Sequence, residues 1–191
     1  MKVAEKPYIV EFNGQPFVLF YGHAPGRSGS QFSNFYESNI TINTNGIRGD
    51  NDLGKFNGEV TLRWSEQYLM LRKALLFGDA AQAVKIISAK SPESAKKLGR
   101  GVKNFDEEVW VRERFGIMVA GLMEKFKDPE LRRYLLETGE ATIVECSPTD
   151  KIWGIGLKLG DLRCFVKDKW NGLNLLGESL MEVRRRILNG E

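Results

Sequence analysis

A glutamate and a lysine seven residues apart, Glu66 and Lys73, are the side chains best suited by type and spacing to carry out chemistry. At about 100° per residue they lie on nearly the same face of a helix, with Met70 between them. A carboxylate can orient water or stabilise positive charge, and a lysine can donate a proton or form a Schiff base. The structural alternative is an acid stabilised by the helix dipole and a lysine whose charged end extends to solvent.

A second group of polar residues lies in the sequence PGRSGSQFSNFY, residues 25–36. Gly/Ser loops with an arginine often present N–H groups to phosphate, so Arg27 is a candidate phosphate ligand. The sequence matches no established phosphate-binding pattern, and an ordinary loop is the alternative. Asn34 lies between Phe32 and Phe35. Because a buried amide must be hydrogen-bonded, Asn34 either braces the loop or contacts a ligand.

Further candidates are a basic residue, two aromatic residues and the loop around one of them. Arg100 belongs to the basic sequence KKLGRGVK, which suits a solvated face, and is the residue there that we expect to contact an anionic ligand. Trp110 and Trp153 either stack on a nucleobase, at about 1–3 kcal/mol per base, or belong to the core. In the sequence CSPTDKIWGIG, Gly154 allows a ligand close to the backbone. Asp150 either acts as a second carboxylate or holds the loop.

The composition argues against several other kinds of site. The chain has one histidine, His23, and two cysteines, Cys146 and Cys164, that form no C-x-x-C pair. A His/Cys zinc site and a histidine-based triad are therefore not expected, and we expect no metal and no cofactor. Two cysteines are too few for a disulfide framework, so both are predicted to be reduced and buried.

The N-terminus and the hydrophobic runs bear on location. The first twelve residues, MKVAEKPYIVEF, carry acids where a signal peptide would be apolar. The longest apolar runs, such as ALLF at 74–77, are too short to span a bilayer. We therefore expect a cytoplasmic protein with no membrane partner.

The elements that position these residues follow from local patterns. Asn13-Gly14 between two β-rich runs predicts a hairpin. After Trp64 the periodicity becomes helical, and each expected helix begins at a polar cap. The predicted caps are Ser65, Asp79, Ser91, Asp106 and Asp128. On the longest of these helices, the residues expected to share one face are Phe115, Met118, Leu122 and Phe126.

A strand at 141–146 and a last helix at 175–188 complete the pattern. Together the elements predict an α+β fold that is mainly helical and has a small N-terminal β region. Without a visible linker or repeat, residues 1–191 are expected to form a single domain.

Taken together, these stretches resemble the NADAR family, also called YbiA-like, over roughly residues 18–188. The motifs that carry the resemblance occur in order along the chain: FSNFY (32–36), WSEQYLMLRKA (64–74), SPESAKKLGR (91–100), Trp110, IMVAGLMEKF (117–126), LLETGEATIVECSPTDKIWGIG (135–156) and WNGLNLLGESLMEVR (170–184). Each motif is weak alone, but the ordered set is specific.

The resemblance implies an α+β fold and hydrolysis of the N-glycosidic bond at ribose C1′. Some members of the family cleave phosphorylated ribosylamino-pyrimidine intermediates of riboflavin synthesis, and others remove ADP-ribose from guanine bases. The implied substrate is thus either a small-molecule nucleotide or ADP-ribosylated nucleic acid. The sequence leaves the oligomeric state open.

The resemblance also implies roles for individual residues. Glu66 matches the acid of the family's SEHY signature and is implied as the central catalytic residue, with Lys73 on the same helix. The remaining matches are Asn34 in FSNF, Arg100 in LGR, Asp150, Trp153 and Gly154 in D-x-x-WG, and Asn174 and Gly177 in N-x-LG.

The chain departs from the family pattern in three places. Gln67 replaces the usual histidine, which weakens a proton-shuttle role for that position. Segments 44–58 and 157–173 look longer than in the smallest members, and both could reshape the substrate entrance.

Two other classes of function stay open at this point. A non-catalytic ADP-ribose or nucleotide-binding module would keep the pocket without cleaving a bond. A small nucleic-acid-binding module would fit the net charge of +3 and the four tryptophans, but the sequence shows no basic stripe.

Overall fold

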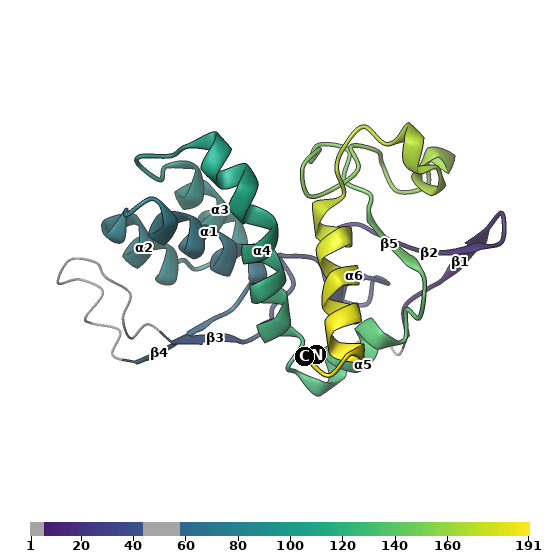
Figure 1. The fold of residues 1–191 in the computed structure, drawn as a ribbon, viewed down its shortest axis with the longest axis horizontal. Helices are drawn as coiled ribbons and strands as arrows, with labels where there is room; N and C mark the ends of the chain where they lie inside the picture. Colours follow the sequence, from purple (N-terminus) through teal and green to yellow (C-terminus); the bar gives the residue numbers. More distant parts are fainter. Residues whose placement is uncertain (1–5, 44–57) are drawn as a thin grey trace. The chain divides into compact units, whose positions relative to one another are not determined.

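The computed structural model describes residues 6–43 and 58–191, so the predicted longer segment at 44–58 lies almost entirely outside the described residues. The chain divides into two compact units. One unit comprises Met1–Tyr36 and Phe126–Glu191, and the other comprises Glu37–Lys125. Helices and small sheets confirm the predicted α+β fold (Figure 1). The single-domain organisation stays a prediction.

The first unit contains a three-stranded sheet in the order β1-β2-β5. The predicted hairpin is confirmed: β1 (Val10–Phe12) pairs antiparallel with β2 (Gln15–Phe20) across Asn13 and Gly14, both with positive φ. β5 (Thr142–Glu145) pairs parallel with β2, although more than 120 residues separate them. β5 is thus an edge strand of this sheet, and its edge opposite β2 can contact elements other than strands.

The other elements of the first unit surround this sheet. They are the 3-10 turns η1 (Ser30–Phe32), η3 (Leu162–Phe165) and η4 (Lys167–Lys169), and the helices α5 (Pro129–Leu136) and α6 (Leu175–Leu188). Figure 1 shows α6 beside β5, in agreement with their contacts. Residues 157–173 thus hold two short turns, followed by α6. Cys146 and Cys164 are buried and free, as predicted.

The second unit is a group of helices with a small antiparallel sheet. Its elements are β3 (Ile40–Asn43), β4 (Glu59–Leu62), α1 (Ser65–Leu76), α2 (Ala80–Ile87), α3 (Pro92–Arg100) and α4 (Glu107–Lys125). α1 packs against α2, α3 and α4, which explains why most of its residues are buried. The helix predicted to carry Glu66 and Lys73 is therefore the centre of this unit.

Four of the five predicted helix caps are confirmed. Asp79, Ser91, Asp106 and Asp128 each accept a hydrogen bond from a backbone N–H in the first turn of the following helix. The prediction for Ser65 is wrong. α1 begins at Ser65 itself, and its Oγ is buried without a hydrogen-bond partner among the described residues.

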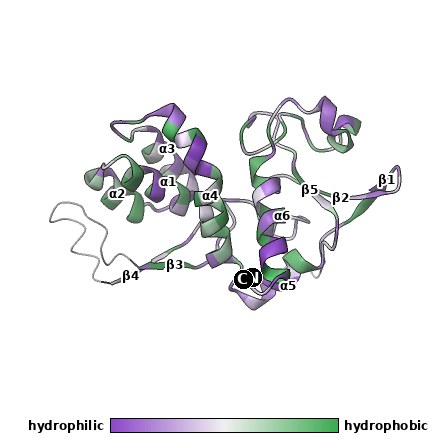
Figure 2. Cartoon of the chain, in the orientation of Figure 1, coloured by the Kyte–Doolittle hydropathy of each residue, from purple (hydrophilic) through white to green (hydrophobic). Residues whose placement is uncertain are grey.

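Three of the four residues predicted to share one face of the longest helix, Met118, Leu122 and Phe126, are buried, and the fourth is not. Phe115 is 36% exposed, because this half of the helix buries the side that carries Trp110 and Arg114. Five of the buried residues of α4 form a stripe within an arc of about 80°, and Val119 and Leu122 are buried beside it. The residues of this stripe are Trp110, Arg114, Met118, Gly121 and Lys125. Figure 2 shows hydrophilic residues gathered in the first half of α4 and hydrophobic residues in the second.

Two glycines of α4 allow a direct test of this packing. A Cβ at Gly121 would lie 2.7 Å from Cε1 of Tyr68, whereas a Cβ at Gly116 would meet open space. We expect Gly121→Ala to lower the free energy of unfolding by about 1–3 kcal/mol through overpacking. Gly116→Ala should raise it by about 0.5–1 kcal/mol. Urea denaturation measures both changes, and equal effects would contradict the described contact of α1 and α4.

Candidate functional site

Glu66 is buried at the start of α1. It is the second residue of the helix and 3% exposed. The N-terminal end of a helix dipole favours a negative charge at this position. The carboxylate of Glu66 therefore lies in a largely dry environment, where its charge acts more strongly than in water.

Gln67, which stands where the family has a histidine, has a structural role. Its Oε1 accepts a hydrogen bond from the Arg63 N–H at 2.9 Å. Its Nε2 donates to the carbonyl oxygens of Ile86 and Ile87 at the end of α2, at 3.0 and 2.9 Å. The amide thus joins the start of α1 to α2 and fixes the backbone next to Glu66.

Lys73 lies in an aromatic setting at the other end of α1. Its Nζ donates to the Gly99 carbonyl at 3.1 Å and lies 4.1 Å from the Phe105 ring centroid and 5.6 Å from that of Trp110. Burial lowers the pKa of Lys73 from its ordinary value, and the charge of Glu107 partly opposes this. The structure therefore brings together two predicted site residues, Lys73 and Trp110.

Two cationic residues of α4 were missed by the sequence reasoning. Arg114 and Lys125 are both buried, and both belong to the stripe that starts at Trp110. Burial lowers the pKa of Lys125 to about 7. Their spacing in the sequence could have identified them: they follow Trp110 by four and fifteen residues, which places all three residues on one side of a helix.

Asp150 holds the loop that follows β5. Its Oδ1 accepts hydrogen bonds from the N–H groups of Ile152 and Trp153, at 2.9 and 2.8 Å. A Cβ at Gly154 would lie 2.9 Å from the Glu145 carbonyl oxygen, so glycine allows this loop to pack on the end of β5. Trp153 is half-buried. Of the two interpretations of Asp150, the geometry supports the loop-holding one directly.

Asn174 connects the same loop and β5 to α6. Its side chain accepts from the Glu145 N–H at 3.0 Å and donates to the Ile143 carbonyl at 2.9 Å. The residue is fully buried, has a left-handed backbone with φ 55°, and lies at the start of α6. Because both polar atoms of the amide pair with β5, Asn174 has a structural role here.

Asn34 and Arg27 differ in how their polar groups are used. Asn34 is 6% exposed, and its Oδ1 has no hydrogen-bond partner in the part of the chain that the structure describes. The bracing interpretation of this side chain therefore has no hydrogen bond to support it. Arg27 is exposed, and its guanidinium donates to the Tyr21 carbonyl at 3.1 Å. Arg100 is also exposed, at the end of α3.

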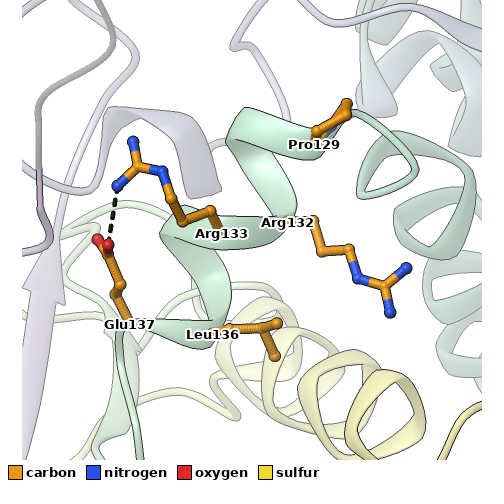
Figure 3. Close-up of a pocket in the computed structure, with 5 residues that line it drawn as sticks. All are labelled: Pro129, Arg132, Arg133, Leu136 and Glu137. Carbon is orange, nitrogen blue, oxygen red and sulfur yellow. Dashed lines mark hydrogen bonds and ion pairs between the residues drawn. The ribbon is translucent and has the colours of Figure 1, made fainter.

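Two cavities of the first unit are lined by none of the predicted site residues. One, of about 430 Å³, lies along α5 and is drawn in Figure 3, where Arg133 pairs with Glu137 and Arg132 points away from them. Another, of about 330 Å³, lies between the β1–β2 hairpin and η4. Within residues 6–43 and 58–191, no group of three or more His, Cys, Asp or Glu side chains is arranged to hold a metal ion. No helix described there has the length and hydrophobicity needed to cross a membrane.

The two interpretations of Asp150 predict different behaviour of two variants. Asp150→Asn keeps an acceptor oxygen for the Ile152 and Trp153 N–H groups, so we expect it to retain the loop, the stability and most of the activity. Asp150→Ala removes that acceptor and should lower the free energy of unfolding by about 1–3 kcal/mol. Thermal denaturation and initial rates test this. A stable Asp150→Asn protein without activity would show instead that the carboxylate takes part in the reaction.

Comparison with known proteins agrees with the resemblance seen in the sequence. The NADAR domain model matches residues 19–188. A protein of Acanthamoeba polyphaga mimivirus named N-glycosidase R617 is 40% identical over 88% of this chain and 94% of its own. The maize riboflavin biosynthesis protein PYRR is 36% identical over 58% of this chain and 16% of its own. The NMR structure of E. coli YbiA matches with a TM-score of 0.65 and 26% identity, over 90% of this chain and 86% of that one. The chain therefore belongs to the NADAR domain family.

Proposed function

We propose that this protein is an N-glycosidase that hydrolyses the bond between ribose C1′ and the nitrogen of a base. The observation that carries the proposal is the buried carboxylate of Glu66 at the start of α1. It stands at the position of the acid in the family signature. The name of the mimivirus relative, N-glycosidase, supports the same reaction class.

The chemistry of this bond explains why a buried carboxylate is needed. Breaking the C1′–N bond builds positive, oxocarbenium-like charge on the sugar. A fixed negative charge beside it stabilises the transition state more than the ground state. In O-glycosidases, carboxylates stabilise such charge or activate water, and Glu66 would do so here. The Gln67 amide, which fixes the adjacent backbone, keeps this charge in place.

Lys73 would serve the leaving base. Its contacts with the Gly99 carbonyl and the Phe105 ring both favour the ammonium form, which can donate a proton to the departing nitrogen. The alternative role, a Schiff base with the C1′ aldehyde of the ring-opened sugar, requires the neutral amine.

The substrate that we propose is a phosphorylated ribosylated base. The two candidates are a free ribosylamino-pyrimidine, in line with the name of the maize relative, and ADP-ribosylated guanine. Both present N–H donors on the base, which need acceptor oxygens in the protein. Mass detection of the released base and sugar from each candidate distinguishes the two.

Glu66→Gln tests the central assignment. The change removes the charge and keeps the shape, so we expect the fold to persist and kcat to fall by about 100-fold or more, as when one stabilising group is lost. Glu93→Gln is the matched control, because Glu93 is an exposed acid in the first turn of α3. Normal turnover by folded Glu66→Gln protein would refute the assignment. Tight product binding by wild-type protein without base release would indicate a nucleotide-binding module.

The pH dependence of Lys73 variants separates its two roles. The pKa of Lys73 is lowered, so the ammonium is lost as pH rises through a value below the ordinary one of 10.5. If the ammonium donates the proton, kcat/KM falls on the alkaline side, and Lys73→Arg moves this fall to higher pH. Lys73→Met should have little activity at any pH. A wild-type rate that rises with pH would favour the Schiff base.

A further inference from the structure

Arg114 is a buried cation that has no partner among the described residues. It is 7% exposed, and its Nε is buried without a hydrogen bond. Across the described ranges 6–43 and 58–191, the guanidinium makes no hydrogen bond, ion pair or cation–π contact. Arg184, the other arginine that is buried among the described residues, donates to Thr138 and to the Ala141 carbonyl.

The position of Arg114 places it beside predicted site residues. It lies one helical turn from Trp110 on the buried stripe of α4. α1 and α4 run antiparallel there, because Lys73 meets Trp110 while the earlier Tyr68 meets Gly121. Arg114 thus lies along α4 between these two contacts, at the interface with the helix that carries Glu66.

The guanidinium is accessible at one end only. Nε is buried. The two terminal nitrogens also form no hydrogen bond with a described residue, but they are not among the buried unpaired atoms, which indicates that they keep some contact with solvent. The part of Arg114 that can form two parallel hydrogen bonds is therefore open to a ligand, while the rest of the side chain is fixed in the protein.

A buried charge without a partner is unfavourable for folding, so its presence calls for a functional reason. We infer that Arg114 binds the phosphoryl group carried on the 5′ oxygen of the substrate ribose. This inference rests on the function proposed above. The planar guanidinium matches phosphate geometry, and partial burial strengthens the attraction. Arg27 and Arg100, the two arginines singled out in the sequence, are exposed and would be screened by salt.

The test compares Arg114→Met with Arg112→Met, an exposed arginine on the same helix that pairs with Glu113. Calorimetric titration would use two phosphorylated ligands, ribose 5-phosphate and ADP-ribose. Ribose and adenosine, which are their parts without phosphate, would serve as the unphosphorylated controls. For Arg114→Met we expect affinity for the two phosphorylated ligands to fall by about 10- to 100-fold, as for loss of a charged hydrogen bond, with no change for the others. Arg112→Met should bind as the wild type does.

Thermal stability provides the second readout. Because Arg114 has no partner to lose among the described residues, Arg114→Met should melt at the wild-type temperature or above it. Unchanged phosphate affinity in folded Arg114→Met protein, or a large loss of stability with unchanged affinity, would overturn the inference. A stronger effect with ADP-ribose than with ribose 5-phosphate would identify the pyrophosphate as the natural ligand, and the reverse would identify a 5′-monophosphate.

The proposed function and this inference can fail separately. If wild-type protein cleaves neither candidate substrate but binds ribose 5-phosphate through Arg114, the anion site stands and the proposed reaction does not. If wild-type protein cleaves a substrate and Arg114→Met keeps the same KM for it, the reaction stands and the anion site does not.

Discussion

The side chain of Asn174 is the interaction on which the first unit depends. Its amide pairs with Ile143 and Glu145 along the edge of β5 that no strand occupies. Gly177 lets α6 approach the same edge, because a Cβ there would overlap the Ile143 carbonyl oxygen. The first N–H groups of α6 donate to carbonyls of Ile152 and Trp153 in the loop after β5. Strand, loop and helix therefore depend on one another.

In the second unit, the corresponding constraint is the burial of polar groups around α1. The Gln67 amide accepts a hydrogen bond from one backbone N–H and donates to backbone carbonyls of α2. By contrast, the Oγ of Ser65 and the Nε of Arg114 have no hydrogen-bond partner among the described residues. Unpaired buried groups reduce stability, and proteins tolerate them chiefly where function requires them. The chemistry proposed for Glu66 and the phosphate contact proposed for Arg114 would both use α1 and the face of α4 that packs against it.

Two of the family motifs contain mostly residues whose contacts stabilise the local fold. In D-x-x-WG and N-x-LG, Asp150, Gly154 and Asn174 have structural contacts that account for their types. Trp153 is half-buried, and no hydrogen bond of its indole N–H to a described residue accounts for its type. A motif can therefore be specific to a family while most of its residues serve local structure.

Local signals in the sequence determined the hairpin at Asn13-Gly14, four of the five helix caps, the limits of the last helix and the α+β class, because each depends on neighbouring residues. Amphipathic spacing also placed Glu66 and Lys73 on one helix. Only the tertiary structure decided that β5 pairs parallel with a distant strand, that Phe115 is exposed and that Arg114 has no partner among the described residues. Pairing and burial of this kind depend on residues far apart in the chain, and no local pattern records which groups meet there.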